Sequence, residues 1–407
     1  MSPARRTVLA GGLAVAAGLA APMPATARDS SARALTWDRL PDLPANDNDW
    51  SPRIPVGETY WSQIGLAGPI AGAVGDHLLV GGGANFPEPA LTASRGGTLG
   101  KVYWDELFVL RRGGTGYEWL PGSHRLRDAV AYAACLSTDH GLLVVGGEGF
   151  RGGPSGSGLG PVEKFSDVYF LRFEPTGQRL VREELPPLPR PASYAVAGVI
   201  DDVVHVAEGA DFWRLDLGQV ARGWQRLPRW PGDPRSVAVG GAQDGRFYLI
   251  SGRSQRADRS WVFHTDAYAY DPRLARWSRI ADAPWCVTAG LAHPVARTGL
   301  YVIGGDSDLD RWNEIERQRS LRDASPAGSE EWHRHDRAIT FIYDHHTGFN
   351  QEILRYDTSR GTWEAVGRFP GPPQVTTPAV SWDGALAVVS GEVRPGVRTS
   401  SVWLGRV

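Results

Sequence analysis

The chain has 407 residues and a formal net charge of −2, so it lacks the basic surplus that nucleic-acid binding or polybasic membrane attachment requires. Its hydrophobic content of 42% is enough for a packed core and excludes a disordered chain. The 50 glycines, 30 prolines and 16 tryptophans indicate many short strands joined by tight turns. We therefore expect an all-β protein with no nucleic-acid partner.

The first residues have the features of an export signal, over 1–27. Arg5 and Arg6 precede an apolar run that is too short to span a membrane, and Ala25–Ala27 has the A-x-A pattern of a cleavage site. Paired arginines before a weakly apolar segment are similar to a twin-arginine signal, and an ordinary secretory peptide is the alternative. We expect an exported, periplasmic or extracellular protein with no membrane anchor, whose folded domain covers 28–407.

A tryptophan followed by a proline-containing turn recurs along the chain. Five copies contain Trp37, Trp119, Trp224, Trp277 and Trp363, and a sixth copy at 180–189 lacks its tryptophan. Short aromatic strands precede the copies, at 106–110, 167–171, 211–216, 266–271 and 352–357. Apolar strands that end in small residues lie upstream, at 78–83, 142–148, 203–209, 247–252, 300–305 and 385–392. With a further apolar strand before each of these, the pattern predicts four-stranded units that resemble the kelch repeats of β-propellers.

Counting the units predicts a six-bladed propeller. Five units have four contiguous strands, whereas the last has strands only at 375–382, 385–391 and 399–405. The strand at 34–40 supplies the missing fourth one, so the N-terminal strand is expected to close the last blade and remove two unpaired sheet edges. A seven-bladed ring with one unrecognised blade is the alternative.

The two cysteines and the long insertions bear on function less directly. Cys135 and Cys286 lie in strand-like apolar runs and are expected to be buried thiols, because two cysteines make no disulfide framework. Surplus length is concentrated at 45–66, 86–101, 149–163 and 306–350, which we interpret as loops that wall a substrate funnel on one face of the ring.

Polar residues directly after the small-residue strand ends should face the central channel. They are Asn85, Glu148, Glu208, Arg253, Asp306 and Glu392. We expect Asn85, Glu148, Arg253 and Asp306 to bind substrate. A loop cap or a structural ion pair is the alternative for each of them.

The segment 390–399 combines two chemically useful side chains. Its Pro395-Gly396 turn allows Glu392 and Arg398 to approach each other. A carboxylate beside a guanidinium stays ionised, which suits a general base, and the planar guanidinium suits a substrate carboxylate. A surface turn with a weak ion pair is the alternative.

Several segments resemble the N-acetylneuraminate (sialic acid) mutarotases, which are six-bladed kelch propellers. They are GEVRPGVRT at 391–399, LLVGGGANF at 78–86, the run at 248–277 and the long insertion before 352–357. The usual first blade of the family corresponds to 203–216 here, so the order of the blades is similar to that of a cyclically permuted branch. The resemblance implies that Glu392 is the catalytic acid/base and that Arg398 binds the sugar acid. It also implies a small sugar as partner, sialic acid or a related one, and no cofactor.

Two other classes of protein stay open. A copper-radical oxidase related to galactose oxidase also has kelch repeats, but the clustered histidines His333, His335, His345 and His346 all lie in one insertion, and we expect no metal. A non-catalytic secreted propeller that binds a sugar or a protein is the second alternative.

Overall fold

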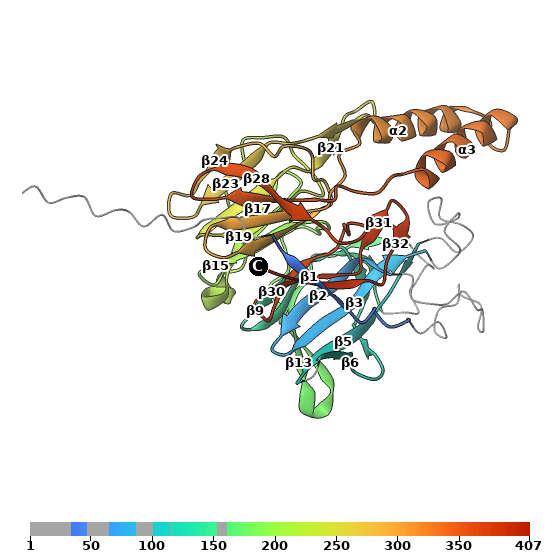
Figure 1. The fold of residues 1–407 in the computed structure, drawn as a ribbon. Coiled ribbons are helices and arrows are strands. Elements are labelled where there is room, and N and C mark those ends of the chain that lie inside the picture. The colour runs from blue at the N-terminus through green and yellow to red at the C-terminus, as the bar shows by residue number, and fades with distance from the viewer. Residues whose placement is uncertain (1–33, 47–64, 87–100, 115, 153–160) are drawn as a thin grey trace, which may run out of the picture. The chain divides into compact units, whose positions relative to one another are not determined.

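The computed structural model describes residues 34–46, 65–86, 101–114, 116–152 and 161–407 (Figure 1). These residues are mostly β-strand, and the strands form small antiparallel sheets. The expected export signal at 1–27 lies outside the described residues, as do most of the insertions at 45–66 and 86–101.

Within the described ranges, six sheets contain four or more strands. The first is β2 (Ala67–Val74), β3 (His77–Asn85), β5 (Glu106–Gly113) and β6 (Gly116–Trp119), with β4 (Val102–Tyr103) and β7 (His124–Arg125) added. The second sheet consists of β9 (Ala134–Thr138), β10 (Gly141–Val145), β13 (Val168–Glu174) and β14 (Arg179–Leu185). The third consists of β15 (Val196–Ile200), β16 (Val203–Glu208), β17 (Asp211–Asp216) and β18 (Gln225–Arg226). The fourth sheet consists of β19 (Val239–Gln243), β20 (Arg246–Ile250), β23 (Ala267–Asp271) and β24 (Arg276–Ile280). The fifth consists of β25 (Leu291–Val295), β26 (Gly299–Ile303), β27 (Glu352–Asp357) and β28 (Thr362–Arg368). The strands that the repeats predict are thus present.

The last of these sheets joins the two ends of the domain. It consists of β29 (Ala379–Trp382), β30 (Ala385–Val389), β33 (Val402–Arg406) and β1 (Thr36–Leu40). β1 pairs antiparallel with β33, from Thr36 opposite Arg406 to Leu40 opposite Val402. The N-terminal strand therefore completes the C-terminal sheet.

Smaller elements lie between these strands. They are the sheets β8 (Ala129–Ala131), β11 (Glu148–Phe150), β12 (Glu163–Lys164); β21 (Arg253–Gln255), β22 (Trp261–Phe263); β31 (Glu392–Arg394), β32 (Val397–Arg398); and the 3-10 turns Pro175–Gly177 and Leu217–Arg222. The glycine doublet between β10 and β11 shows why small residues end the second strands. Gly146 has φ +66° and a Cβ there would meet the carbonyl oxygen of Ala192, so no larger residue fits without a shift.

The hydrophobic core lies between neighbouring sheets. Leu78 and Phe108 of the first sheet pack in one cluster with Val380 and Leu404 of the last. The first strands also contact one another in series, β2 with β9, β9 with β15, β15 with β19, β19 with β25, β25 with β29 and β29 with β2. Each sheet is therefore covered on both faces by its neighbours, as large apolar side chains on both faces require.

The repeated tryptophans connect each repeat to the turn of the one before it. The indole Nε1 atoms of Trp119, Trp224, Trp277 and Trp363 donate to carbonyl oxygens in those turns, at Pro41 (3.1 Å), Pro186 (2.8 Å), Pro228 (2.8 Å) and Ala281 (2.9 Å). The degenerate copy at 180–189 has no tryptophan, but its Pro186 carbonyl still accepts the hydrogen bond from the tryptophan of the next copy. Trp37 is the exception, since its Nε1 has no hydrogen-bond partner among the described residues.

A series of residues in the left-handed conformation lies at or just before the first strand of each sheet. They are Gly68, Tyr132, Tyr194, Val237, Ala289 and Thr376, with φ between 48° and 61°. Backbone N–H groups in this series donate to the carbonyl of the neighbouring sheet, from Gly68 to Thr376, Tyr132 to Gly68, Tyr194 to Tyr132, Ala289 to Val237 and Thr376 to Ala289. Below them lies an apolar cavity of ≈ 170 Å³, lined by residues of the first strands.

The insertion at 306–350 was expected to be a loop, and this expectation is wrong. It contains α2 (Leu309–Ala324) and α3 (Glu330–Asp344), which pack against each other as a hairpin (Figure 1). The helices begin at side-chain caps, because Asp308 accepts from the Arg311 N–H and Ser329 accepts from the Trp332 N–H. Ile315, Ile339 and Tyr343 are buried between them.

Candidate active site

A cavity of ≈ 530 Å³ collects most of the residues that follow the small-residue strand ends. It is lined by Glu148, Glu208, Arg253, Asp306 and Glu392, and by Arg398. Glu392 and Arg398 share one hairpin, Glu148, Glu208 and Arg253 come from three other sheets, and Asp306 follows β26. The repeat brings them together because equivalent strand ends in successive sheets face the same side.

Asn85 is the predicted site residue that does not line this cavity. Its side chain is 1% exposed, its Nδ2 donates to the Gly65 carbonyl at 3.0 Å, and its Oδ1 accepts from Trp104 Nε1 at 2.9 Å. β3 continues through its glycines to Asn85, so this side chain is directed into the core and both its polar groups are used there. Asn85 therefore has a structural role.

Glu392 and Arg398 face each other across a two-stranded hairpin. They are opposite each other in the pairing of β31 with β32, and Glu392 Oε1 lies 3.4 Å from Arg398 Nη1. Oε1 also accepts from the Gly396 N–H at 2.7 Å, which fixes the carboxylate over the Pro395-Gly396 turn. The predicted approach of these two residues is confirmed.

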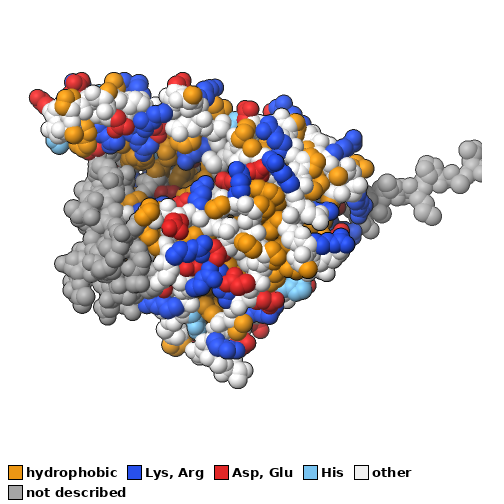
Figure 2. Space-filling model, turned by 180° about the vertical axis from the view of Figure 1, so that it is seen from behind, with side chains coloured by type: hydrophobic (Ala, Val, Ile, Leu, Met, Phe, Trp, Pro, Cys, Tyr) orange, Lys and Arg blue, Asp and Glu red, His pale blue; other side chains and the backbone are white. Residues whose placement is uncertain are grey.

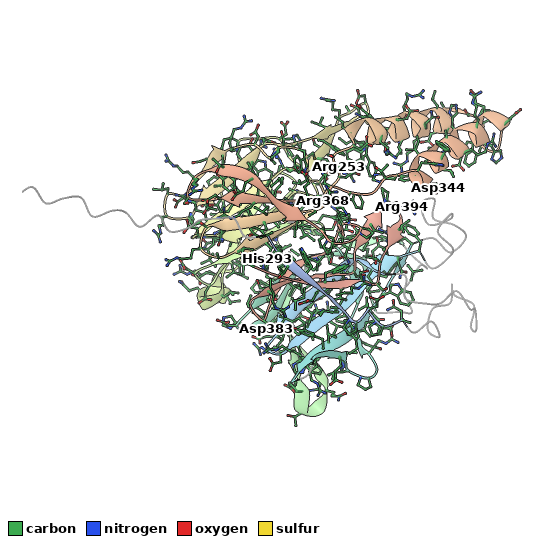
Figure 3. All side chains as sticks on the ribbon, viewed as in Figure 1. Arg253, His293, Asp344, Arg368, Asp383 and Arg394 are labelled. Carbon is green, nitrogen blue, oxygen red and sulfur yellow. The ribbon has the colours of Figure 1, made fainter. Side chains whose placement is uncertain are left out.

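The hairpin is held in place from two sides. The backbone N–H and carbonyl of Glu392 both bond to Val375. At the tip, the Arg394 guanidinium donates to the carbonyl of Asp344 at the end of α3, at 3.2 Å, and Figure 3 shows these two residues side by side. The helical hairpin thus supports the strand hairpin that carries Glu392.

The Arg398 guanidinium is buried and short of partners. Its side chain is 4% exposed, and among the described residues its Nε and Nη1 atoms have no hydrogen-bond partner. The guanidinium lies over the Phe86 ring, 4.6 Å from the centroid. Burying a cation with unused donors costs free energy, so this arrangement favours an anionic ligand that would use them.

Arg253 and Asp306 form a second charged region of the same cavity. The Arg253 guanidinium lies between the rings of Trp261 and Trp312, 4.3 and 4.6 Å from their centroids, at the base of the helical hairpin (Figure 3). Its burial lowers the pKa of Arg253, and the charge of Asp306 opposes that shift. The Nε of Arg253 has no hydrogen-bond partner among the described residues.

Asp306 is held as a carboxylate. Its oxygens accept from Trp312 Nε1 at 2.6 Å and from the Asp308 N–H at 2.9 Å, and His346 Nε2 lies 3.5 Å away. Burial alone would raise the pKa of Asp306, but these contacts outweigh burial and hold the pKa below its usual value. Trp312, which comes from α2, therefore connects the insertion to the cavity.

Sequence reasoning missed the two lysines of the chain. Lys101 and Lys164 both line the cavity, with their Nζ atoms 3.8 Å from Glu148 and 3.6 Å from Glu208. All the other Lys or Arg positions of the chain are arginine, and this rarity of lysine is the sequence feature that distinguishes Lys101 and Lys164.

The other chemically notable side chains lie elsewhere. Cys135 and Cys286 are buried free thiols, as predicted. Of the clustered histidines, the buried His335 bonds to Gln318 of α2 at 2.7 Å, and the exposed His345, which caps the end of α3, bonds to the Phe341 carbonyl at 2.8 Å. In the part of the chain that the structure describes, no three His, Cys, Asp or Glu side chains are grouped as metal ligands.

The face of the molecule seen from behind has no single patch of one charge (Figure 2). Figure 2 shows basic and acidic side chains interspersed there, in keeping with a net charge of −2. None of the described helices has both the length and the apolar character needed to cross a bilayer.

Comparison with solved structures identifies the class of fold. The chain is similar to a structure titled "Structure of YjhT", with a TM-score of 0.55 and 14% identity, over 88% of this chain and 97% of that one. Together with the strand pairing above, this defines a propeller-like protein built of small antiparallel sheets.

Comparison with known sequences identifies the family. The model of the N-acetylneuraminate epimerase family matches residues 185–407, and the chain belongs to this family. It is 27% identical over 233 residues to the N-acetylneuraminate epimerase of Yersinia enterocolitica, covering 55% of this chain and 58% of that protein. It is 23% identical over 260 residues to N-acetylneuraminate epimerase 1 of Escherichia coli, covering 60% and 65%. The matched region thus spans less than two thirds of the length of these relatives.

Proposed function

We propose that this protein interconverts the anomers of a sialic acid or a related sugar acid, with Glu392 as acid/base and Arg398 as carboxylate-binding residue. The observation that carries the proposal is the 3.4 Å separation of Glu392 Oε1 and Arg398 Nη1 at the cavity. In a 2-keto sugar acid the carboxylate and the anomeric hydroxyl are attached to the same carbon. An arginine that binds the carboxylate therefore brings the hydroxyl next to Glu392. The names of the relatives support the same substrate class.

The reaction follows from these two residues. Glu392 accepts the proton of the anomeric hydroxyl while the ring oxygen gains a proton, and the bond between the anomeric carbon and the ring oxygen breaks. Rotation of the opened carbonyl and return of the protons give the other anomer, so no atoms or electrons are gained or lost. Acid/base assistance of this kind contributes about 10²–10⁴-fold, which suffices for a reaction that also proceeds slowly without a catalyst.

We also infer that the six larger sheets are the blades of one ring, closed by β1. The pairing of β1 with β33, the serial contacts of the first strands and the hydrogen bond from Gly68 to Thr376 support this. A ring closed by a strand from the other end of the chain is compatible with a permuted order of the blades.

The test is a proton NMR time course of freshly dissolved N-acetylneuraminate. The wild-type protein should equilibrate the anomers faster than buffer alone, and Glu392→Gln should lower the catalysed rate by about 10²–10⁴-fold. Glu364→Gln is the matched control, because Glu364 is a half-buried carboxylate on β28 that also pairs with an arginine, Arg355, and does not line the cavity. Binding of the sugar without faster equilibration would indicate a sugar-binding propeller and overturn the proposal.

We further propose that residues 1–27 direct export, on the strength of the arginine pair and the cleavage pattern. Cell fractionation should find the processed protein outside the cytoplasm. Replacing Arg5 and Arg6 by lysine should retain it inside if the signal is of the twin-arginine type. Unprocessed protein in the cytoplasm of wild-type cells would contradict the proposal.

A further inference from the structure

One wall of the cavity carries a polar cluster that the reaction above does not use. Lys101 Nζ lies 3.8 Å from Glu148 Oε1 and donates to the phenol oxygen of Tyr132 at 3.4 Å. The Tyr103 hydroxyl donates to the same Glu148 oxygen at 2.9 Å. The ammonium also lies over both phenol rings, 4.9 Å from the centroid of Tyr103 and 4.7 Å from that of Tyr132.

These contacts fix the hydrogen-bonding roles of the cluster. Burial and the neighbouring charge of Glu148 raise the pKa of Tyr103, so its hydroxyl keeps its proton and donates to Glu148. The oxygen of Tyr132 accepts from Lys101, which directs its own proton away from Lys101. A lysine ammonium has three N–H donors, so Lys101 has a further donor beyond those two contacts.

The floor beside this cluster is aromatic. The rings of Tyr132 and Tyr194 are stacked with centroids 4.3 Å apart and both residues have φ of 58°, an unfavourable conformation for a bulky side chain. Both residues line the cavity. The backbone therefore keeps two phenol rings at a place where the C–H face of a sugar can rest on them.

The cluster differs from the Arg398 region in its hydrogen bonding, since each region pairs one basic with one acidic side chain. Lys101, Tyr132 and Glu148 present donors and an acceptor side by side. Arg398 forms an ion pair with Glu392, but its buried Nε and Nη1 have no hydrogen-bond partner among the described residues, and these donors favour an anion. A hydroxyl group, which donates and accepts at once, suits the first wall better than a second anion does.

We propose that Lys101, Tyr132 and Glu148 form a subsite for the polyhydroxylated arm of the sugar acid, while Arg398 binds its carboxylate. This inference rests on the proposed function and adds the part of the substrate that the protein selects. A sugar acid with a glycerol-like side arm is then preferred over one in which the arm is short. Lys101 is a specificity residue in this assignment and not a participant in proton transfer to the anomeric centre.

The test compares two substrates in one set of variants. The substrates are N-acetylneuraminate and the analogue whose side arm is shortened by periodate oxidation and borohydride reduction of the methyl glycoside, which is then hydrolysed to restore the free anomeric centre. Lys101→Met keeps most of the length of the side chain but removes its charge and its N–H donors. It should raise KM for the full-length sugar about ten- to hundredfold, the range for a lost hydrogen bond from a charged donor, and leave kcat close to wild type. KM for the shortened sugar should change little.

Two further variants keep the result interpretable. Tyr132→Phe removes only the phenol hydroxyl and should show the same selective effect if Lys101→Met does not fold. Arg172→Met is the control, because Arg172 lies on β13 and pairs with Glu183 at the surface. An equal rise in KM for both sugars, or a fall in kcat alone, would overturn the subsite.

Failure of the proposed function gives a different result. If the wild-type protein accelerates exchange of neither sugar, the proposed function fails, and the subsite is then judged by the Kd of the two sugars. Tighter binding of the full-length sugar that is lost in Lys101→Met supports the subsite. An equal ratio of the two Kd values in wild type and variant overturns it.

Discussion

At the residue scale, the most informative side chain is Arg398, because it is buried beside Glu392 and yet its Nε and Nη1 atoms have no hydrogen-bond partner among the described residues. Proteins rarely bury a cation in this way unless a ligand completes the contacts. The geometry beside Glu392 also limits which substitutions can preserve binding, since a planar guanidinium offers two parallel donors and an ammonium does not.

Arg398→Lys is expected to weaken binding of N-acetylneuraminate about ten- to hundredfold, because the bidentate contact to the carboxylate is lost while the charge stays. Calorimetric titration of the variant measures this directly. Arg406→Lys is a suitable comparison, because Arg406 pairs with Asp38 and Tyr117 on the outer strands. Equal affinity of Arg398→Lys and wild type would show that the carboxylate binds elsewhere.

The candidate site could be predicted from the sequence only where one hairpin contains all of it. Glu392 and Arg398 are six residues apart around a Pro-Gly turn, so local geometry decides their approach. Lys101 and Tyr132 belong to different repeats, and their contact depends on which sheets are neighbours. Asn85 does not line the cavity because its strand continues past the glycines, a register that periodicity does not reveal.

At the scale of the element, the repeated Trp-to-turn hydrogen bond allows a matched comparison. Trp277→Phe removes the bond from the indole Nε1 to the Pro228 carbonyl and should cost about 1 kcal/mol of unfolding free energy beyond the loss of packing. Trp37→Phe removes an Nε1 without a described partner and should cost less. Urea denaturation of the two variants measures the difference, and an equal loss would show that packing alone accounts for these tryptophans.

Burial of histidine inside a sheet makes stability depend on pH. His205 is packed among Phe212, Phe247 and Tyr270, and burial lowers its pKa to about 4. Between pH 6.5 and 4 the unfolded chain binds a proton that the folded chain does not, so stability falls as the pH falls through this range. The contribution amounts to up to about 3 kcal/mol.

His205→Phe should therefore reduce the loss of unfolding free energy between pH 7 and pH 5, even if it changes stability at pH 7. His140→Gln is the control, since His140 is exposed. His293, whose pKa burial also lowers to about 4, keeps part of the pH dependence in both variants. If His205→Phe and the wild type lose the same unfolding free energy between pH 7 and pH 5, burial does not lower the pKa of His205 and the prediction is wrong.

Strands and helices differed in how well the sequence predicted them. The strands follow a fixed order of apolar, small and aromatic residues that recurs in six units, so each unit supports the prediction made for the others. The helices at 309–324 and 330–344 occur once, so no repeat signals them. Asp308 and Ser329 are typical helix N-cap residues, but such residues also begin turns, so on their own they do not predict a helix.

At the scale of the whole molecule, the pairing of β1 with β33 predicts that the first strand is essential. A chain that starts at residue 41 lacks β1 and leaves the edge of β33 unpaired, so it should unfold at a lower temperature and self-associate through this edge. A chain that starts at residue 34 keeps β1 and should match the processed protein. Adding a peptide of residues 34–40 should partly restore the truncated chain, and equal unfolding temperatures of the two chains would contradict the closure.

The hydrogen bonds between left-handed residues have a mechanical consequence. The five bonds run from Val237 through Ala289, Thr376, Gly68 and Tyr132 to Tyr194, and each joins the backbone of one sheet to that of its neighbour. Moving the sheet that contains Gly68, or the one that follows Tyr132, Ala289 or Thr376, would stretch two of these bonds at once, which opposes separation of neighbouring sheets. Substitutions at Lys101 or Glu148 leave these backbone bonds in place, whereas a change at Tyr132 alters a residue of the series itself.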